Sequence, residues 1–282
     1  MNLQQSVHKN QSVTLPDGRR LGYAEYGVPH GNPVLFFHGA PGSSHVHADM
    51  AKVATQRGVR LIAIDRPGYG VSDLQHGRTF LSWADDIAVL TNMLKIDQFS
   101  IIGFSGGSPY PLVCANKYPG RVKKIALVAA LVPGVTDGMP PMVGGLYALA
   151  QTNPDELRKT FAAVAPSAAE LLEVVSATAG DWDKIVLKNH SKEFERDYKQ
   201  TLLNGIEGIA SDYILFSGSY DFPLAEIKTE VHLWSGTLDQ NTPPAMTHYL
   251  ASQLPCCHTH MLQDEGHFVL HGHWDEILKS VT

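Results

Sequence analysis

The sequence predicts an α/β fold: a mostly parallel central sheet flanked by helices and interrupted by a helical insertion. Over the first 130 residues, short apolar runs alternate with longer amphipathic stretches, as in parallel sheets covered on both faces. Between residues 133 and 223 the apolar runs stop while helical periodicity continues, and the runs then return. We therefore expect an α/β core of residues 1–132 and 224–282, and a helical cap of residues 133–223.

The core elements follow from these runs in chain order. A hairpin comes first, because the turn Pro16-Asp17-Gly18 joins two alternating segments. The expected strands are Ser12–Leu15, Arg20–Tyr26, Pro33–Phe37, Val59–Ile64, Phe99–Ile102, Lys124–Ala130, Val231–Ser235 and Cys256–Leu262. The expected core helices are Ala48–Arg57, Phe80–Lys95, Ser108–Tyr118, Pro243–Leu254 and Phe268–Ser280. Ligands of such sheets bind at the carboxyl ends of the strands, where His38, Asp65 and Ser105 stand.

The insertion is expected to be entirely helical. Its periodic stretches are Met139–Gln151, Asp155–Val164, Ser167–Thr178, Asp181–Asn189 and Glu193–Ile209. Six large side chains in it are candidates to line an apolar cavity or to pack the cap on the core: Met139, Met142, Leu146, Tyr147, Phe161 and Trp182.

Composition excludes several classes of protein. The chain has 282 residues, of which 44% are apolar and 18% charged, which is typical of a globular domain. Its net charge of −6 and short basic clusters argue against a nucleic-acid partner. The three cysteines do not suggest a disulfide scaffold, and no apolar run approaches the ~20 residues of a membrane span. Met1–Pro16 is polar and resembles no signal peptide, so we expect a cytoplasmic protein with no membrane partner. The sequence leaves its oligomeric state open.

The segment Gly103-Phe104-Ser105-Gly106-Gly107 carries the strongest chemical signal. It matches G-x-S-x-G, in which a serine on a strained strand-to-helix turn exposes its hydroxyl above a sheet. Side chains two residues before and after the serine would collide, so glycine is needed there. The backbone N–H of Gly106 then faces a developing oxyanion. Pro109 and Pro111 predict a distorted first turn in the following helix.

With four further segments, this segment resembles the α/β-hydrolase fold superfamily, in its serine hydrolase branch. His38–Gly42 resembles the H-G-x-P-G oxyanion loop, and Asp65–Asp73 resembles the turn after the next strand. Gly236–Asp239 and Gly266–Phe268 resemble the acid and histidine segments. The order serine, aspartate, histidine is the one expected for this fold.

The resemblance implies a role for each site residue. Ser105 is the expected nucleophile, His267 its general base, and Asp239 the carboxylate that orients the histidine. Asp137 is an alternative acid, because some members of the superfamily use that position. The backbone N–H groups of Ala40 and Gly106 are expected to form the oxyanion hole. No cofactor is required.

The expected activity is hydrolysis of an ester or related acyl bond in a small, largely apolar molecule. A proline-iminopeptidase-like peptidase is one alternative, because His38–Gly42 comes close to H-G-G-P-G. It would need a cap carboxylate for a free amine, and Glu170, Glu173 and Glu207 are the candidates. A carbon–carbon bond hydrolase and a ligand receptor on the same scaffold are the others.

Fourteen histidines raise the question of a metal site. Three pairs are close in sequence: His45 with His47, His258 with His260, and His271 with His273. The chain contains neither H-E-x-x-H nor C-x-x-C, the spacings typical of zinc ligands. We therefore expect no metal.

Overall fold

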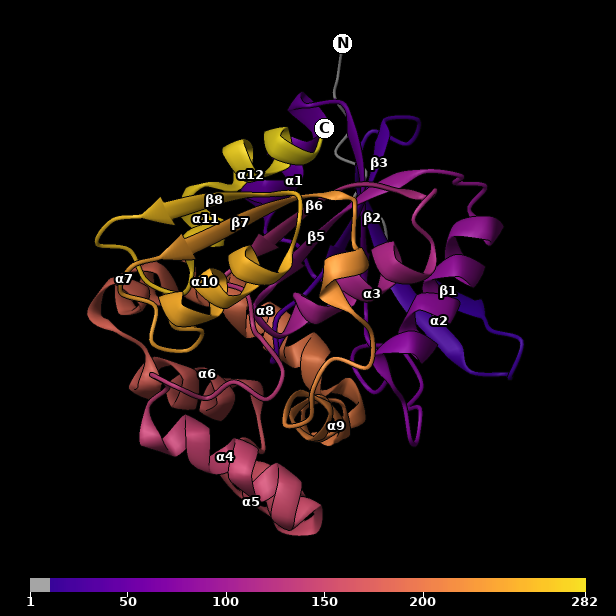
Figure 1. Cartoon of the computed structure of the whole chain (residues 1–282). Helices are drawn as coiled ribbons and strands as arrows, with labels where there is room; N and C mark the ends of the chain where they lie inside the picture. Colours follow the sequence, from indigo (N-terminus) through magenta and orange to yellow (C-terminus); the bar gives the residue numbers. More distant parts are fainter. Residues whose placement is uncertain (1–10) are drawn as a thin grey trace.

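The computed structural model describes residues 11–282, and its centre is one sheet of eight strands (Figure 1). Residues 1–10, which belong to the segment expected not to be a signal peptide, lie outside the described residues. The strands are β1 Gln11–Thr14, β2 Arg20–Gly27, β3 Asn32–Phe37, β4 Val59–Ile64, β5 Phe99–Phe104, β6 Val122–Val128, β7 Glu230–Gly236 and β8 Cys257–Leu262. Every expected strand is present, with bounds shifted by a few residues at most.

The strand order is β1-β2-β4-β3-β5-β6-β7-β8. β1 and β2 form the expected antiparallel hairpin, and β2 pairs antiparallel with β4. All pairs from β4 to β8 are parallel, so the carboxyl ends of β3, β5 and β7 lie on one edge of the sheet. The predicted α/β fold with a mostly parallel sheet is confirmed.

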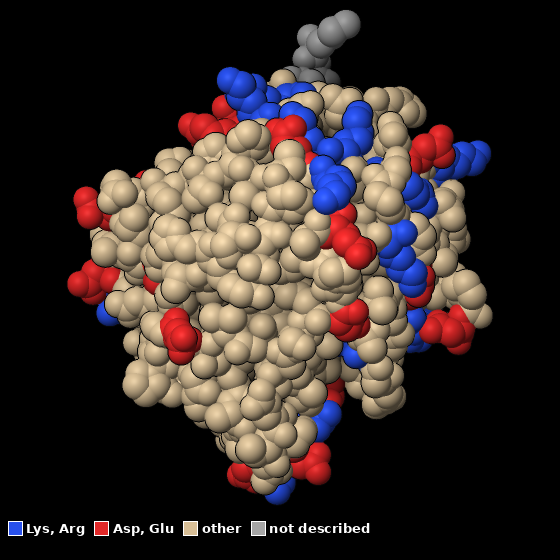
Figure 2. Space-filling view, viewed as in Figure 1, with Lys and Arg blue, Asp and Glu red and all other residues tan. Residues whose placement is uncertain are grey.

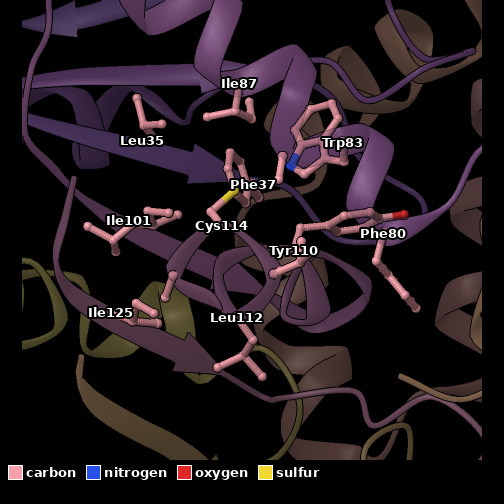
Figure 3. Close-up of a cluster of buried hydrophobic side chains, with 14 of the residues drawn as sticks. Leu35, Phe37, Phe80, Trp83, Ile87, Ile101, Tyr110, Leu112, Cys114 and Ile125 are labelled. Atoms are coloured by element: carbon pink, nitrogen blue, oxygen red, sulfur yellow. The ribbon is translucent and has the colours of Figure 1, made fainter. Parts of the chain in front are cut away.

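Helices cover both faces of the sheet. α1 Ala48–Gln56, α11 Val269–Gly272 and α12 Trp274–Val281 pack on one face, in a hydrophobic cluster with Val34, Ala63 and Ile102. α2 Phe80–Met93, α3 Pro109–Lys117 and α10 Pro244–Gln253 pack on the other. Figure 3 shows that second cluster, in which Phe37 and Trp83 meet edge to face with ring centroids 5.3 Å apart. Alternate residues of the central strands therefore enter different cores, as a sheet covered on both faces requires.

Six α-helices follow one another between β6 and β7, and we refer to them as the cap helices. They are α4 Pro141–Thr152, α5 Pro154–Val164, α6 Ala168–Thr178, α7 Asp181–Asn189, α8 Ser191–Thr201 and α9 Glu207–Phe216. In Figure 1, α4, α5, α6 and α9 lie at the bottom, away from α1 and α12 at the top. No strand interrupts the described chain between residues 129 and 229. The division into core 1–132 with 224–282 and cap 133–223 stays a prediction.

Two helix predictions are wrong, because the structure has two helices where each predicted one. The predicted helix Glu193–Ile209 is two helices, α8 and α9, separated at Gly205, whose φ of 72° cannot continue a right-handed helix. The predicted helix Phe268–Ser280 is also two, α11 and α12, which meet at His273. The segment Gly103–Gly107, called the elbow below, contains a short 3₁₀ helix, Ser105–Gly107, and α3 begins at Pro109. The distortion of that helix expected from Pro109 and Pro111 stays a prediction.

Within residues 11–282, no single helix is long and apolar enough to cross a membrane; only α5 and α6 taken together pass that test, and they bend by 104° between them. Figure 2 shows that Lys and Arg side chains on the viewed face lie among Asp and Glu side chains. That face carries no uniformly basic surface of the kind a nucleic acid would contact.

Candidate active site

Ser105 stands where β5 turns into the helix that follows it. Its φ is +51°, a left-handed conformation that a non-glycine residue rarely adopts. A Cβ on Gly103 would lie 2.8 Å from the Gly107 carbonyl oxygen, and one on Gly107 would overlap the Phe37 carbonyl oxygen. Neither position can therefore hold a larger residue without moving backbone. The collision at Gly103 lies within the turn, as the sequence predicted, whereas a side chain at Gly107 would collide with the end of β3.

His267 and Ser105 come together from segments 162 residues apart in the chain. His267 Nε2 lies 2.9 Å from Ser105 Oγ, which is hydrogen-bond distance. The histidine is buried after β8, and its ring lies 5.3 Å from that of Phe104, the residue before the serine. Burial alone would lower the pKa of His267, but the carboxylate of Asp239 outweighs that effect and the net shift is upward.

Asp239 lies behind His267, in the turn after β7. Its Oδ2 is 2.9 Å from His267 Nδ1, and the side chain is fully buried. The backbone N–H groups of Asn241 and Thr242 donate to Oδ1, each at 2.9 Å, and Thr242 Oγ1 donates to Oδ2 at 2.8 Å. The carboxylate is thus fixed by its own turn. Asp137, the alternative acid, is exposed and makes no hydrogen bond to His267 in the described chain.

Ala40 belongs to the loop after β3, next to the elbow. A Cβ on Gly106 would lie 2.8 Å from the Cβ of Ala40, so the two backbones are in close contact. The Ala40–Pro41 peptide bond is cis. His38 Nδ1 lies 2.7 Å from the Gly39 carbonyl oxygen, and His38 Nε2 accepts from the N–H of Arg66 at 3.2 Å. His38 therefore braces this loop through contacts of both ring nitrogens.

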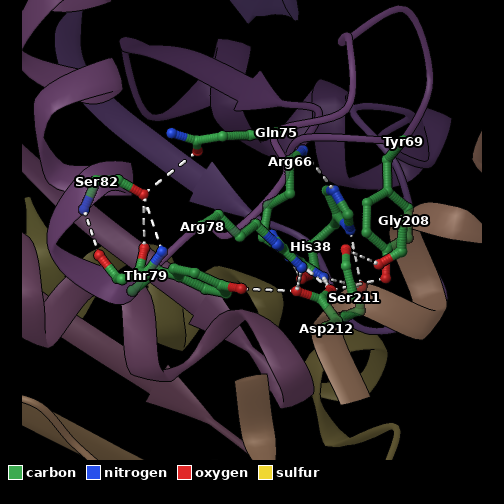
Figure 4. A network of polar contacts seen from close by, with 12 residues as sticks. His38, Arg66, Tyr69, Gln75, Arg78, Thr79, Ser82, Gly208, Ser211 and Asp212 are labelled. Atoms are coloured by element: carbon green, nitrogen blue, oxygen red, sulfur yellow. Dashed lines mark hydrogen bonds and ion pairs between the residues drawn. The ribbon is translucent and has the colours of Figure 1, made fainter. Parts of the chain in front are cut away.

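A buried ion network joins this loop to the cap helices (Figure 4). Arg66 donates through Nη2 to the Gly39 carbonyl oxygen at 2.8 Å and to Asp212 Oδ2 at 2.7 Å, while its Nη1 donates to the carbonyl of His38. Asp212 lies on α9 and also accepts from Arg78 and from the hydroxyls of Tyr69 and Tyr110. Burial alone would raise the pKa of Asp212, but the two arginines outweigh it and hold that pKa below its usual range.

Asp183 reaches the histidine segment from another cap helix, α7. Its Oδ1 accepts from the N–H of Phe268 at 2.9 Å, and it is 1% exposed. A Cβ on Gly266 would lie 2.5 Å from Asp183 Oδ2. Only glycine before His267 therefore leaves room for this carboxylate. Neither Asp183 nor Asp212 was predicted from the sequence, because each lies in the insertion and is remote in sequence from the motif it contacts.

A cavity of about 400 Å³ opens onto these residues. Ser105, His267, Ala40 and Gly106 line one side of it, and the cap helices line most of the rest with apolar side chains. Of the six cap side chains that could line a cavity or pack the cap on the core, Met142, Leu146, Tyr147 and Phe161 line the cavity, whereas Met139 and Trp182 pack against the hydrophobic clusters.

The lining of this cavity includes no charged Asp, Glu, Lys or Arg side chain among the described residues. Of the three candidate carboxylates for an amine, Glu170 and Glu173 are exposed. Glu207 pairs with Arg158, 3.1 Å away. The cavity therefore suits an uncharged, largely apolar molecule.

Comparison with known proteins places the chain in a family. The protein-family model described as alpha/beta hydrolase fold matches residues 32–273 of this chain. A non-heme chloroperoxidase from Streptomyces lividans is 36% identical over 137 residues, which are 46% of this chain and 50% of the relative. The chain thus spans about half the length of the curated relatives it matches.

Solved structures match over almost the whole chain. A hydrolase from Pseudomonas aeruginosa has a TM-score of 0.75 at 15% identity and covers 97% of this chain and 98% of its own. Est816, described as an N-acyl homoserine lactone degrading enzyme, has a TM-score of 0.72 at 20% identity and covers 96% and 100%. The arrangement of strands, elbow and helices, together with the family model, shows that this chain belongs to the alpha/beta hydrolase fold family.

Proposed function

We propose that the protein is a serine hydrolase that cleaves an ester or related acyl bond of a small, largely apolar substrate. The observation that carries the proposal is the continuous chain of hydrogen-bond contacts from Asp239 through His267 to Ser105, which ends in an apolar cavity. Nucleophile, base and orienting carboxylate within hydrogen-bond reach are the signature of an activated serine.

The reaction begins when His267 Nε2 removes the proton of Ser105 Oγ and the oxygen attacks the carbonyl carbon of the substrate. The N–H groups of Ala40 and Gly106 hold the oxyanion. His267 then gives its proton to the leaving group as the acyl bond breaks. Water, deprotonated by His267, attacks the acyl-enzyme and releases the acid.

The raised pKa of His267 suits this cycle. A base accepts a proton more readily as its pKa rises, and the ideal value lies near the working pH. Asp239 supplies the stabilising charge at Nδ1 and holds the ring so that Nε2 faces the serine. Because Asp239 is itself held by Asn241 and Thr242, it loses little freedom when the imidazolium forms.

The cavity favours an ester or lactone over the alternatives. A peptidase that recognises a free amine needs a carboxylate in its pocket, and a hydrolase of an acidic diketone needs a cationic side chain there. Among the described residues, neither a carboxylate nor a Lys or Arg side chain lines this cavity. The proposal also includes a small-molecule substrate, no nucleic-acid partner, no cofactor and a cytoplasmic location. A receptor on the same scaffold would share the geometry and differ in turnover.

Release of p-nitrophenol from acetate, butyrate and octanoate esters tests the proposal. We expect the wild type to turn over and the Ser105→Ala variant to lose about a million-fold in kcat, as is typical when a triad nucleophile is removed. The chain-length profile would then report the depth of the cavity. An inactive wild type, or an equally active variant, would rule out serine ester hydrolysis; single-turnover release would favour the receptor.

A further inference from the structure

Three histidines from separate parts of the chain meet at the boundary between the core and the cap helices. His47 precedes α1 in the core, His190 joins α7 to α8 in the cap, and His271 lies in α11. One ring nitrogen from each lies within 4.8 Å of the others. The ring centroids of His47 and His271 are 4.5 Å apart, and those of His190 and His271 are 5.3 Å apart.

Two of these rings have a buried nitrogen without a hydrogen-bond partner in the described part of the chain. Nδ1 of His47 and Nδ1 of His271 are both buried without a hydrogen-bond partner among the described residues. Burying an unpaired polar atom is costly, so such atoms call for a partner. Helix capping does not explain the placement either. His47 and His190 occupy the residues before α1 and α8, where Ser, Thr, Asp or Asn is preferred, and neither side chain caps its helix.

The chemical state of the rings suits a metal. Metal ions bind the unprotonated nitrogen of neutral imidazole. Burial lowers the pKa of His47 to about 4 and holds the pKa of His271 well below its usual range, so both rings are neutral at neutral pH. Imidazole is a preferred ligand of Zn²⁺ and of the divalent ions Cu²⁺ and Ni²⁺.

We propose that His47, His190 and His271 form a binding site for a divalent transition metal, Zn²⁺ above all, that fastens the cap helices to the core. Nitrogens on a tetrahedral zinc stand roughly 3.4 Å apart, given Zn–N bonds of about 2.0–2.1 Å. Rotations of the three rings can close the remaining gap from separations of up to 4.8 Å. A water molecule would complete four-fold coordination.

The location gives the site a structural consequence. His271 follows His267 by four residues, and His190 ends the same cap helix, α7, from which Asp183 contacts the N–H of Phe268. A metal would therefore hold α7 to the histidine segment at a second point. The three ligands lie at positions 47, 190 and 271, so no local spacing in the sequence could have indicated them.

Titration of the chelator-treated, untagged full chain with ZnCl₂ in a calorimeter tests the site. We expect one equivalent to bind the wild type, and the affinity to fall by at least about 100-fold in His190→Ala and in His271→Gln. The matched control is His258→Ala. It removes an exposed histidine from the other imidazole cluster, on β7 and β8, where the His232 and His258 rings stack 5.1 Å apart.

Thermal unfolding provides an independent measurement. At a Zn²⁺ concentration about 100 times the dissociation constant, we expect the Tm of the wild type and of His258→Ala to rise by roughly 5 °C, and that of His190→Ala to stay unchanged. Equal Tm values of the variants without metal would show that they fold. The proposal is overturned if the wild type binds no zinc, if His190→Ala and His271→Gln bind it as well as the wild type, or if His258→Ala is the variant that loses it.

Discussion

The core and the cap helices contribute different kinds of side chain to the same cavity. Every group that would exchange a proton or hold charge in the proposed reaction comes from the core: Ser105, His267, Asp239 and the backbone of Ala40 and Gly106. The cap helices contribute most of the apolar wall. They also send two buried carboxylates, Asp183 and Asp212, to the core loops without lining the cavity.

This difference separates three properties that substitutions can probe. Core substitutions are expected to change the rate of the chemical step. Substitutions in the cap wall are expected to change which substrates fit. Substitutions of the two cap carboxylates are expected to change how firmly the core loops are held.

The largest effect is expected from Asp239→Asn. The amide would hold His267 in the wrong tautomer, with a proton on Nε2, and could not stabilise the imidazolium. The expected loss is about 10⁴-fold in kcat for a p-nitrophenyl ester. Asp137→Asn is the matched control, because that residue is exposed, and its kcat should not change. The opposite pattern would assign the acid to Asp137.

Asp212→Asn should weaken the attachment of the cap helices to the core. The substitution leaves Arg66 and Arg78 buried with less compensating charge, and breaking a buried ion pair in this way costs about 3–5 kcal/mol of unfolding free energy. Urea denaturation measures the loss. Glu195→Gln, which removes an exposed ion pair with Lys199, should change stability little. Equal stability of the two variants would contradict the account.

Gly106→Ala should disturb the oxyanion hole while leaving the triad in place. The added Cβ would lie 2.8 Å from Ala40 Cβ and 3.0 Å from the Phe216 ring, so the loop after β3 must shift. Loss of one oxyanion donor costs about 100-fold or more in kcat. The control is Gly120→Ala, where a Cβ meets open space. A Gly106→Ala variant with the wild-type kcat would argue against an oxyanion hole at this place.

The pH dependence of kcat/KM should report the neutral form of His267. Its pKa is raised above 6.5, because Asp239 outweighs the opposing effect of burial. Since the base acts unprotonated, kcat/KM should fall about tenfold per pH unit below that raised pKa, and level off above it. An acid limb centred below pH 6.5 would contradict the geometry. As a control, a second substrate without an ionisable group should give the same profile, which would exclude ionisation of the substrate as its cause.

The smallest effect is expected from Val175→Phe, which fills part of the cavity from α6. Each methylene of a buried acyl chain contributes about 0.8 kcal/mol, or roughly fourfold in kcat/KM. The variant should therefore lose the preference for the longer esters by about that factor per excluded methylene, and keep acetate turnover. Ile185→Phe, on an exposed cap position, should leave the profile unchanged.

The sequence predicted the parts of the structure that depend on local geometry. The glycine at 103 follows from collisions within one turn, and Gly106 lies next to Ala40 as the motif order suggested. The central strands β3 to β7 were predictable because each is a short apolar run whose residues enter two cores. The proximity of Asp239, His267 and Ser105 followed from resemblance, and their catalytic roles stay predictions.

Contacts between the insertion and the core could not be predicted. Asp183 and Asp212 are acidic residues, which usually face solvent, and only the docking of α7 and α9 buries them. The break between α8 and α9 had a signal in Gly205, which the helical periodicity on both sides outweighed. The histidine cluster likewise depends on three segments that meet only in the folded chain.

Labelling with a fluorophosphonate tests whether Ser105 is an activated nucleophile. The serine oxygen would attack phosphorus, fluoride would leave, and a stable phosphonate ester would remain on the nucleophile. We predict a single adduct whose peptide map places it on Ser105, with no adduct in Ser105→Ala and much slower labelling in His267→Ala. An adduct on another residue, or labelling that does not depend on His267, would contradict the claim that these two residues form an activated nucleophile.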